Sequence, residues 1–230
     1  TITISWRIVK MKLSSQTINV LKNFSTINQN LVIKEGSNIS TMSAMKNIIA
    51  KATVEETFSK EFAIYDLNEF LSVISLFSNP ELDFKENFVL ITEEGSSKSS
   101  TYWYSDPSVV TTPTKDITMP STEVTFDISS DTLSEITRAA SVIGAPDMVL
   151  ENGELKVTDK KNTTANDFTL KLDVPKSEVD YKFWFKVENL KLLPGSYGVK
   201  VSSKKISEFN NSNVDVSYFI ALEPESSYDA

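Results

Sequence analysis

The sequence contains neither cysteine nor histidine among its 230 residues. The lack of cysteine excludes disulfide scaffolds, thiolate zinc sites, iron–sulfur clusters and thiol nucleophiles. The lack of histidine removes the side chain that most often acts as a general base or binds a transition metal. These two absences favour a binding or structural protein over an enzyme, and they predict that the chain holds neither a metal nor a cofactor.

Long hydrophobic runs and glycine-rich stretches are also missing. No apolar run approaches the 18 residues of a membrane-spanning helix, so we expect no membrane partner. Residues 1–9 are too short and too polar for a secretory signal peptide, which favours a cytosolic protein. With only 6 Gly the chain has no phosphate-binding glycine loop, which argues against nucleotide hydrolysis.

Charge is distributed unevenly along the chain. The first 34 residues contain no acidic residue but five basic ones, namely Arg7, Lys10, Lys12, Lys22 and Lys34. All 31 acidic residues and the other 18 basic residues follow, and the net charge of the whole chain is −8. Positive charge is therefore concentrated at one end of an acidic protein.

Most of the remaining pattern is typical of short antiparallel strands. Runs rich in β-branched and aromatic residues predict strands at 31–33, 58–65, 88–92, 101–104, 168–174, 181–187, 197–203 and 214–222. Asn152-Gly153 lies between two apolar runs and predicts a tight hairpin turn.

Four segments show helical spacing instead, at 14–28, 66–77, 131–143 and, as a short turn, 186–193. The first and third lie about 115 residues apart, and the second and fourth about 120. This order predicts an α+β fold of two similar domains, each with an antiparallel sheet and two helices. Three prolines between them mark residues 105–122 as an extended connector.

The polar face of the first helix carries lysines, amides and hydroxyls without a carboxylate. Its members are Lys12, Gln16, Asn19, Lys22, Asn23 and Thr26. The third helix offers Ser134, Thr137, Arg138 and Ser141, with Asp131 at its start. Such faces suit weak contacts with a duplex backbone that do not depend on base sequence, although a solvated helix face would look similar.

Several strings then stand out in order along residues 11–230. They are Met11-Lys-Leu-Ser14, Leu21-Lys-Asn-Phe-Ser-Thr-Ile-Asn28, Ala63-Ile-Tyr-Asp-Leu-Asn68, Trp103 with Asp106-Pro-Ser-Val109, Leu193-Pro-Gly-Ser-Tyr197 and Tyr218-Phe-Ile-Ala-Leu-Glu223. This set resembles the sliding clamps of T4-type bacteriophages. The resemblance implies the DNA-clamp fold, with domains at 11–104 and 123–230, the connector between them, and residues 1–10 as an extension or an upstream translation artefact.

The resemblance also implies a function without catalytic chemistry. A homotrimeric ring would encircle double-stranded DNA, be opened by an ATP-driven clamp loader, and tether the replicative DNA polymerase to give processivity. Such clamps also support late transcription, and the protein would act in the cytoplasm of the infected bacterial host. A ring holds DNA by topology, so a weakly attractive bore and an acidic exterior suit this mechanism.

Site residues follow from the same resemblance. Lys12, Lys22 and Arg138 match basic positions of the bore helices, Lys191 matches more weakly, and Asn19 and Asn23 lie on the same face as Lys22. Partner peptides would enter an apolar pocket beside the connector. Its candidate residues are Val109, Val110, Pro113, Ile117, Ala221, Leu222 and Pro224. The alternative is that these seven residues only pack the connector onto a sheet.

Subunit contacts are expected at edge strands near 88–104 and 197–209, with Trp103 and Trp184 in the core. Two other functions are open alternatives. A β-rich trimeric structural or adhesion protein of a phage particle would share the strand content and acidity, but it needs no basic helix faces. A hydrolase could use paired carboxylates, Asp147 with Glu151 or Glu93 with Glu94, but neither pair has a partner base.

Overall fold

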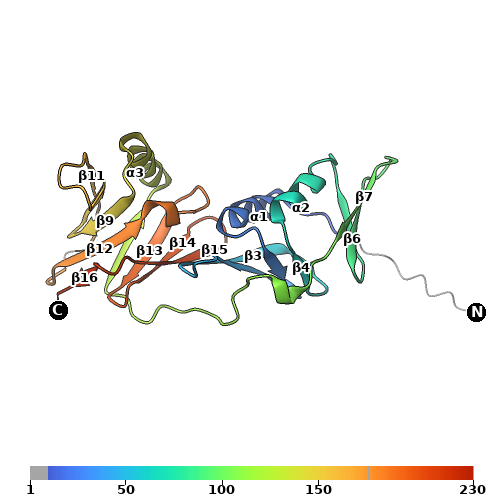
Figure 1. Cartoon of the computed structure of the whole chain (residues 1–230), viewed down its shortest axis with the longest axis horizontal. Helices are drawn as coiled ribbons and strands as arrows, with labels where there is room; N and C mark the ends of the chain where they lie inside the picture. Colours follow the sequence, from blue (N-terminus) through green and yellow to red (C-terminus); the bar gives the residue numbers. More distant parts are fainter. Residues whose placement is uncertain (1–9, 176, 230) are drawn as a thin grey trace, which may run out of the picture. The chain divides into compact units, whose positions relative to one another are not determined.

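Three segments with apolar residues at helical spacing form the α-helices of the computed structural model, which describes residues 10–175 and 177–229 (Figure 1). These are α1 (Ser15–Ile27), α2 (Leu67–Ile74) and α3 (Ser130–Ile143), which confirms the three long helices predicted from the sequence. Ser14, Asp66 and Ser129 cap the three N-termini through side-chain oxygens that accept backbone N–H groups. None of the helices in the described residues is long and apolar enough to cross a membrane.

The chain divides into two units. Unit 1 contains the described residues up to Thr41 together with Thr53–Thr112, and unit 2 contains Met42–Ala52 and the described residues from Pro113 onward. The division falls within β3 (Ile48–Phe58). The domain boundaries given above remain a prediction, and residues 1–9 of the expected extension lie outside the described residues.

In unit 1 the two helices pack against each other and against an antiparallel sheet (Figure 1). This sheet has the order β4-β1-β2-β3, with β1 (Leu31–Ile33), β2 (Gly36–Met42) and β4 (Phe62–Ile64). A second sheet has the order β5-β6-β7, with β5 (Glu81–Phe84), β6 (Phe88–Thr92) and β7 (Ser99–Trp103). Leu21 and Phe24 of α1 and Phe70 of α2 are buried in the core of this unit.

Unit 2 also has two sheets. One runs from the first half of β3 through β15 (Val216–Ala221), β14 (Ile206–Asn211) and β13 (Tyr197–Ser202) to β8 (Val124–Ile128). The other has the order β11-β10-β9-β12-β16, with β9 (Asp147–Glu151), β10 (Glu154–Thr158), β11 (Phe168–Lys171), β12 (Tyr181–Lys186) and β16 (Ser227–Tyr228). Helix α3 contacts β10 and β11.

Some local predictions are confirmed and others are wrong. Asn152 and Gly153 join β9 to β10 with φ of 46° and 88°, the left-handed pair that a tight hairpin turn requires. The expected fourth helix is only a single 3₁₀ turn, η2 (Val187–Asn189), because β12 extends through Lys186 and Pro194 follows closely. The strand predicted at 58–65 is two strands, since β3 ends at Phe58 and β4 begins at Phe62.

Candidate DNA-facing and partner-binding surfaces

The outer face of α1 is polar and free of carboxylates. Asn19 and Lys22 are exposed on it, and Asn23 is half-buried. No carboxylate forms an ion pair with Lys22 within the described part of the chain. Lys12 lies just before the helix, where its Nζ is 3.8 Å from the Glu81 carboxylate that also binds Lys10 at 3.0 Å. The charge of Lys12 is therefore partly compensated, and Lys22 is the cation that defines this face.

The start of α1 is held by a carboxylate from the sheet beneath it. Glu56 of β3 accepts hydrogen bonds from the backbone N–H of Ser14 and from the hydroxyl of Thr17. Glu56 is 9% exposed and Thr17 is fully buried. A negative charge at a helix N-terminus is favourable, because unpaired N–H groups and the helix dipole both point toward it. The orientation of α1 is thus fixed at the end nearest Lys12.

The outer face of α3 is mixed in charge. Ser134, Arg138 and Ser141 are exposed as expected, but Asp131 and Glu135 are exposed as well. Glu135 precedes Arg138 by three residues, so the two side chains are neighbours on the helix surface. The exposed face of α3 therefore carries one guanidinium and two carboxylates, so it is less positive than the exposed face of α1.

The second helix and the segment around η2 carry little positive charge. On α2 and its C-cap the exposed polar side chains are Asn68, Glu69, Ser72 and Ser75, none of them basic. Lys191 follows η2 and does not lie on a helix, and its side chain is half-buried.

The candidate pocket residues divide between the two units. In unit 1, Val110 packs with Val32 and Ala63 in the core, whereas Val109 is 60% exposed at the end of η1 (Pro107–Val109). In unit 2, Pro113 and Leu222 are buried, Ile117 and Ala221 are half-buried, and Pro224 is exposed.

Hydrogen bonds and an ion pair hold the connector and tail segments that carry the candidate pocket residues of unit 2. The sequence pattern did not reveal these contacts. Lys51 of β3 donates hydrogen bonds to Asp116 Oδ1 at 3.1 Å and to the Ile117 carbonyl at 3.2 Å, while lying 5.6 Å from the ring centre of Phe219. The backbone N–H of Ala221 donates to the Asn47 carbonyl at 3.0 Å. Connector and tail are therefore each fastened to the sheet of unit 2.

The carboxylate pairs proposed for a hydrolase have structural partners. Asp147 is 1% exposed and accepts hydrogen bonds from Lys186 Nζ at 2.7 Å and from the Lys160 backbone at 3.1 Å. Glu93 accepts the Asn79 N–H at 2.7 Å, and this bond lowers the pKa of the Glu93 carboxyl below its usual value. Neither arrangement leaves a buried carboxylate poised for proton transfer, which weakens the enzyme alternative.

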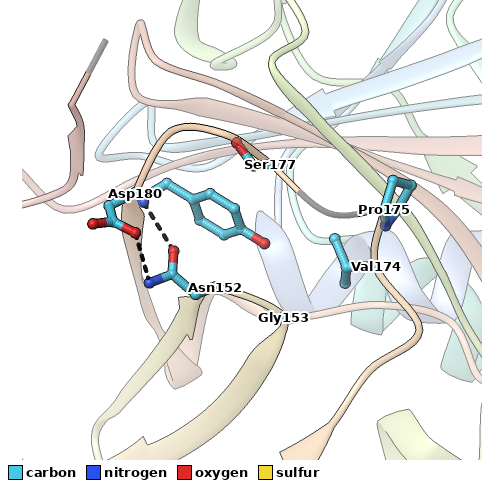
Figure 2. Close-up of a pocket in the computed structure, with 7 residues that line it drawn as sticks. Asn152, Gly153, Val174, Pro175, Ser177 and Asp180 are labelled. Carbon is cyan, nitrogen blue, oxygen red and sulfur yellow. Dashed lines mark hydrogen bonds between the residues drawn. The ribbon is translucent and has the colours of Figure 1, made fainter.

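One cavity of about 250 Å³ lies beside the β9–β10 turn (Figure 2). Figure 2 shows Asn152 pointing toward Asp180, to which its Nδ2 donates a hydrogen bond of 3.2 Å, while its Oδ1 accepts the Tyr181 N–H at 3.2 Å. The side-chain amide of Asn152 is thus hydrogen-bonded to Asp180 and Tyr181, and these bonds stabilise the turn. We assign this cavity no chemistry.

The sheet edges differ from the prediction in one unit. In unit 1, β7 is an edge strand as expected, and its Trp103 is 65% exposed, with its ring centre 5.0 Å from that of Phe88. The assignment of Trp103 to the core is therefore wrong. In unit 2, the predicted edge at 197–209 is also wrong, because β13 pairs with both β8 and β14. Trp184 is half-buried, with Lys160 and Lys182 at 5.6 and 5.5 Å from its ring centre.

Comparison with known proteins accounts for this arrangement. Residues 12–112 match the family described as DNA polymerase processivity factor, and residues 122–224 match the gp45 sliding clamp, C terminal family. The chain is 36% identical to the sliding clamp of Vibrio phage KVP40, over 93% of this chain and 99% of that protein. The chain belongs to the sliding-clamp family. The sliding clamp of Escherichia phage RB69 is 29% identical, over 95% of this chain and all of that protein.

The clamp fold extends beyond phage relatives. Proliferating Cellular Nuclear Antigen from Entamoeba histolytica aligns with a TM-score of 0.70 at 16% identity, covering 93% of this chain and 97% of that one. At this identity the likeness shows the fold alone. As a member of the sliding-clamp family, the protein is a DNA polymerase processivity factor, and the α+β clamp fold implied by the resemblance is confirmed.

Proposed function

We propose that this clamp closes as a homotrimeric ring around double-stranded DNA and tethers the replicative DNA polymerase in the cytoplasm of the infected host. A clamp loader driven by ATP opens the ring, and late transcription uses the same ring. The observation that carries the proposal is the outer face of α1, which offers Lys22 and amide side chains without an acid in a protein of net charge −8. A ring retained by topology needs weak, mobile phosphate contacts, because tight ones would slow its sliding.

Ring closure is supported by two strand edges. The exposed side chains of β7 are Ser99, Thr101 and Trp103, none of them charged. An edge strand without charges or proline invites pairing with another chain. In unit 2, β11 ends the five-stranded sheet, and its four residues include a single charged side chain, Lys171. We propose that β7 of one subunit pairs with β11 of the next.

Contacts with partner peptides are proposed on apolar residues of each unit, taken separately. Val109 is exposed and Val110 lies directly behind it in the core of unit 1. Ala221, Leu222 and Pro224 offer an apolar tail in unit 2. Apolar residues of this kind suit a short peptide that carries aromatic and aliphatic side chains.

Two measurements test the function. Light scattering over a concentration series should approach about 77 kDa, three times the 25.7 kDa of the chain. The loaded protein should then stay on a closed DNA circle and leave once the circle is cut. Retention on cut DNA, or a persistent monomer at high concentration, would overturn the topological mechanism. A trimer that ignores both DNA forms would favour the structural phage protein instead.

A further inference from the structure

The chain after β15 is hydrogen-bonded to β12 at several positions between Glu223 and Tyr228. The N–H of Glu223 donates to the Trp184 carbonyl at 2.8 Å, and the Ser226 hydroxyl accepts the Trp184 N–H at 2.8 Å. Farther on, β16 pairs with β12, with Tyr228 opposite Tyr181. This segment, residues 222–229, carries Leu222 and Pro224, two of the residues proposed to contact partner peptides.

Two lysines from outside these two strands bind the same segment. Lys205 donates a hydrogen bond from Nζ to the Pro224 carbonyl, and Lys160 binds two carboxylates of the segment. Lys160 follows β10, and its Nζ is 3.2 Å from Glu223 Oε2 and 3.1 Å from Glu225 Oε2. Its side chain is only 11% exposed and lies beside the Trp184 ring. Burial alone would lower the pKa of the Lys160 ammonium, but the two carboxylates outweigh burial and raise that pKa. Lys160 is therefore charged at neutral pH, and its ammonium pairs with the carboxylates of the residues immediately before and after Pro224.

The backbone of Lys160 is itself held by a buried carboxylate. The buried carboxylate of Asp147 accepts the Lys160 backbone N–H through Oδ2 and the Lys186 ammonium through Oδ1. The Lys186 Nζ in turn lies 3.8 Å from the Glu223 carboxylate. The Lys160 ammonium thus lies where the carboxylates of Glu223 and Glu225 converge, with Lys186 also near Glu223, and a fixed partner costs less side-chain entropy than a mobile one.

We propose that Lys160 is a positioning residue for the partner-peptide surface, acting through Glu223 and Glu225 to hold Leu222 and Pro224 in the conformation that receives the peptide. This inference rests on the proposed function, since it presumes that these two residues contact a partner. The inference adds that the affinity for a partner peptide depends on the ion pairs of Lys160 with Glu223 and Glu225, although the peptide does not contact Lys160.

The test compares two adjacent lysines in the full-length protein. Lys160→Met removes the cation that binds the segment, and Lys161→Met removes an equal charge from an exposed neighbour. The probe is a labelled synthetic peptide of roughly ten residues from the C-terminus of the polymerase of the same phage. We expect Lys160→Met to weaken its binding about fivefold and Lys161→Met to change it less than about twofold.

A purely structural role is separated by two further readouts. Lys160→Arg should restore affinity, because a guanidinium keeps the charge and the hydrogen bonds. Hydrogen exchange should accelerate at the amides of residues 222–229 in Lys160→Met, and again in Glu225→Gln, which changes an exposed side chain and leaves the core intact. Faster exchange with unchanged peptide affinity would overturn the positioning role, as would equal losses in both lysine variants.

The outcome for the proposed function is read separately. A parent protein that stays on closed DNA circles but ignores the peptide would refute the partner surface, and with it the positioning role of Lys160. A parent protein that binds the peptide but is not retained on closed circles would refute the ring and leave the lysine comparison valid.

Discussion

At the scale of single residues, Lys22 carries the argument for DNA contact. It is the exposed cation of α1, whereas Lys12 shares Glu81 with Lys10 and Arg138 lies near Glu135. Each phosphate contact releases counterions, so affinity falls as salt rises. Lys22→Gln should make the slope of log affinity against log salt less steep by up to about three, since a trimer carries one Lys22 in each subunit. The measurement is a salt titration of binding to duplex DNA.

A substitution on α3 should have the opposite effect on DNA binding. Replacing Glu135 by Gln removes a carboxylate beside Arg138 and should strengthen DNA binding at low salt, while Lys34→Gln, in an exposed position between β1 and β2, should leave it unchanged. If Lys34→Gln lowered the salt slope as much as Lys22→Gln, general charge and not the α1 face would be responsible.

A second residue prediction concerns Glu56, which holds the start of α1. Glu56→Gln keeps the shape of the side chain but removes its charge from the helix N-terminus and weakens two hydrogen bonds. We expect the free energy of unfolding to fall by about 1–2 kcal/mol. Glu55→Gln is the matched control, because Glu55 is exposed on the other face of the same strand. Urea unfolding of both variants measures the difference, and equal stabilities would show that Glu56 does not anchor the helix.

At the scale of elements, helices were easier to predict than strands. The helical spacing of apolar residues marked the positions of α1 and α2 directly, because periodicity is a local signal. Strand β3 was missed, since small and acidic residues such as Ala50, Ala52 and Glu56 occupy its buried positions. What buries them is pairing and packing with distant segments, which composition does not encode.

The sheet edges show the same limit. Trp103 was assigned to the core on its chemistry, but β7 has no neighbour beyond it within the described residues. The polar anchors of the connector and tail were missed too, since nothing in the local sequence pairs Lys51 with Asp116 or Lys160 with Glu225.

A prediction at this scale follows from the exposed edge. Trp103→Lys should place a charge on the edge strand proposed to pair with the next subunit, and it should raise the concentration needed for trimer formation by about tenfold or more. Val142→Lys, which changes a 76% exposed residue of α3, should leave assembly unchanged. Light scattering at matched concentrations measures both, and a trimer as stable in Trp103→Lys as in the parent would exclude β7 from the interface.

At the scale of the whole molecule, the two proposed tasks use different chemistry. Holding DNA requires a closed ring and a weakly basic surface, whereas tethering a polymerase requires apolar contact with a peptide. In this clamp Lys22 is charged and exposed, while Val110 and Leu222 are 8% and 7% exposed. The two tasks should therefore separate under substitution.

The double variant Val110→Ala with Leu222→Ala makes that separation measurable. Shortening one aliphatic side chain in each unit should weaken polymerase tethering about tenfold while retention on closed circles stays within about twofold, because topology does not depend on the peptide contacts. Val157→Ala, a truncation at a 1% exposed position of β10, controls for lost stability. Processive synthesis on a primed circle reports tethering, and clamp retention on the same circle reports closure. Loss of both activities to the same extent in the double variant would mean that these residues support the fold of each unit and not the partner surface.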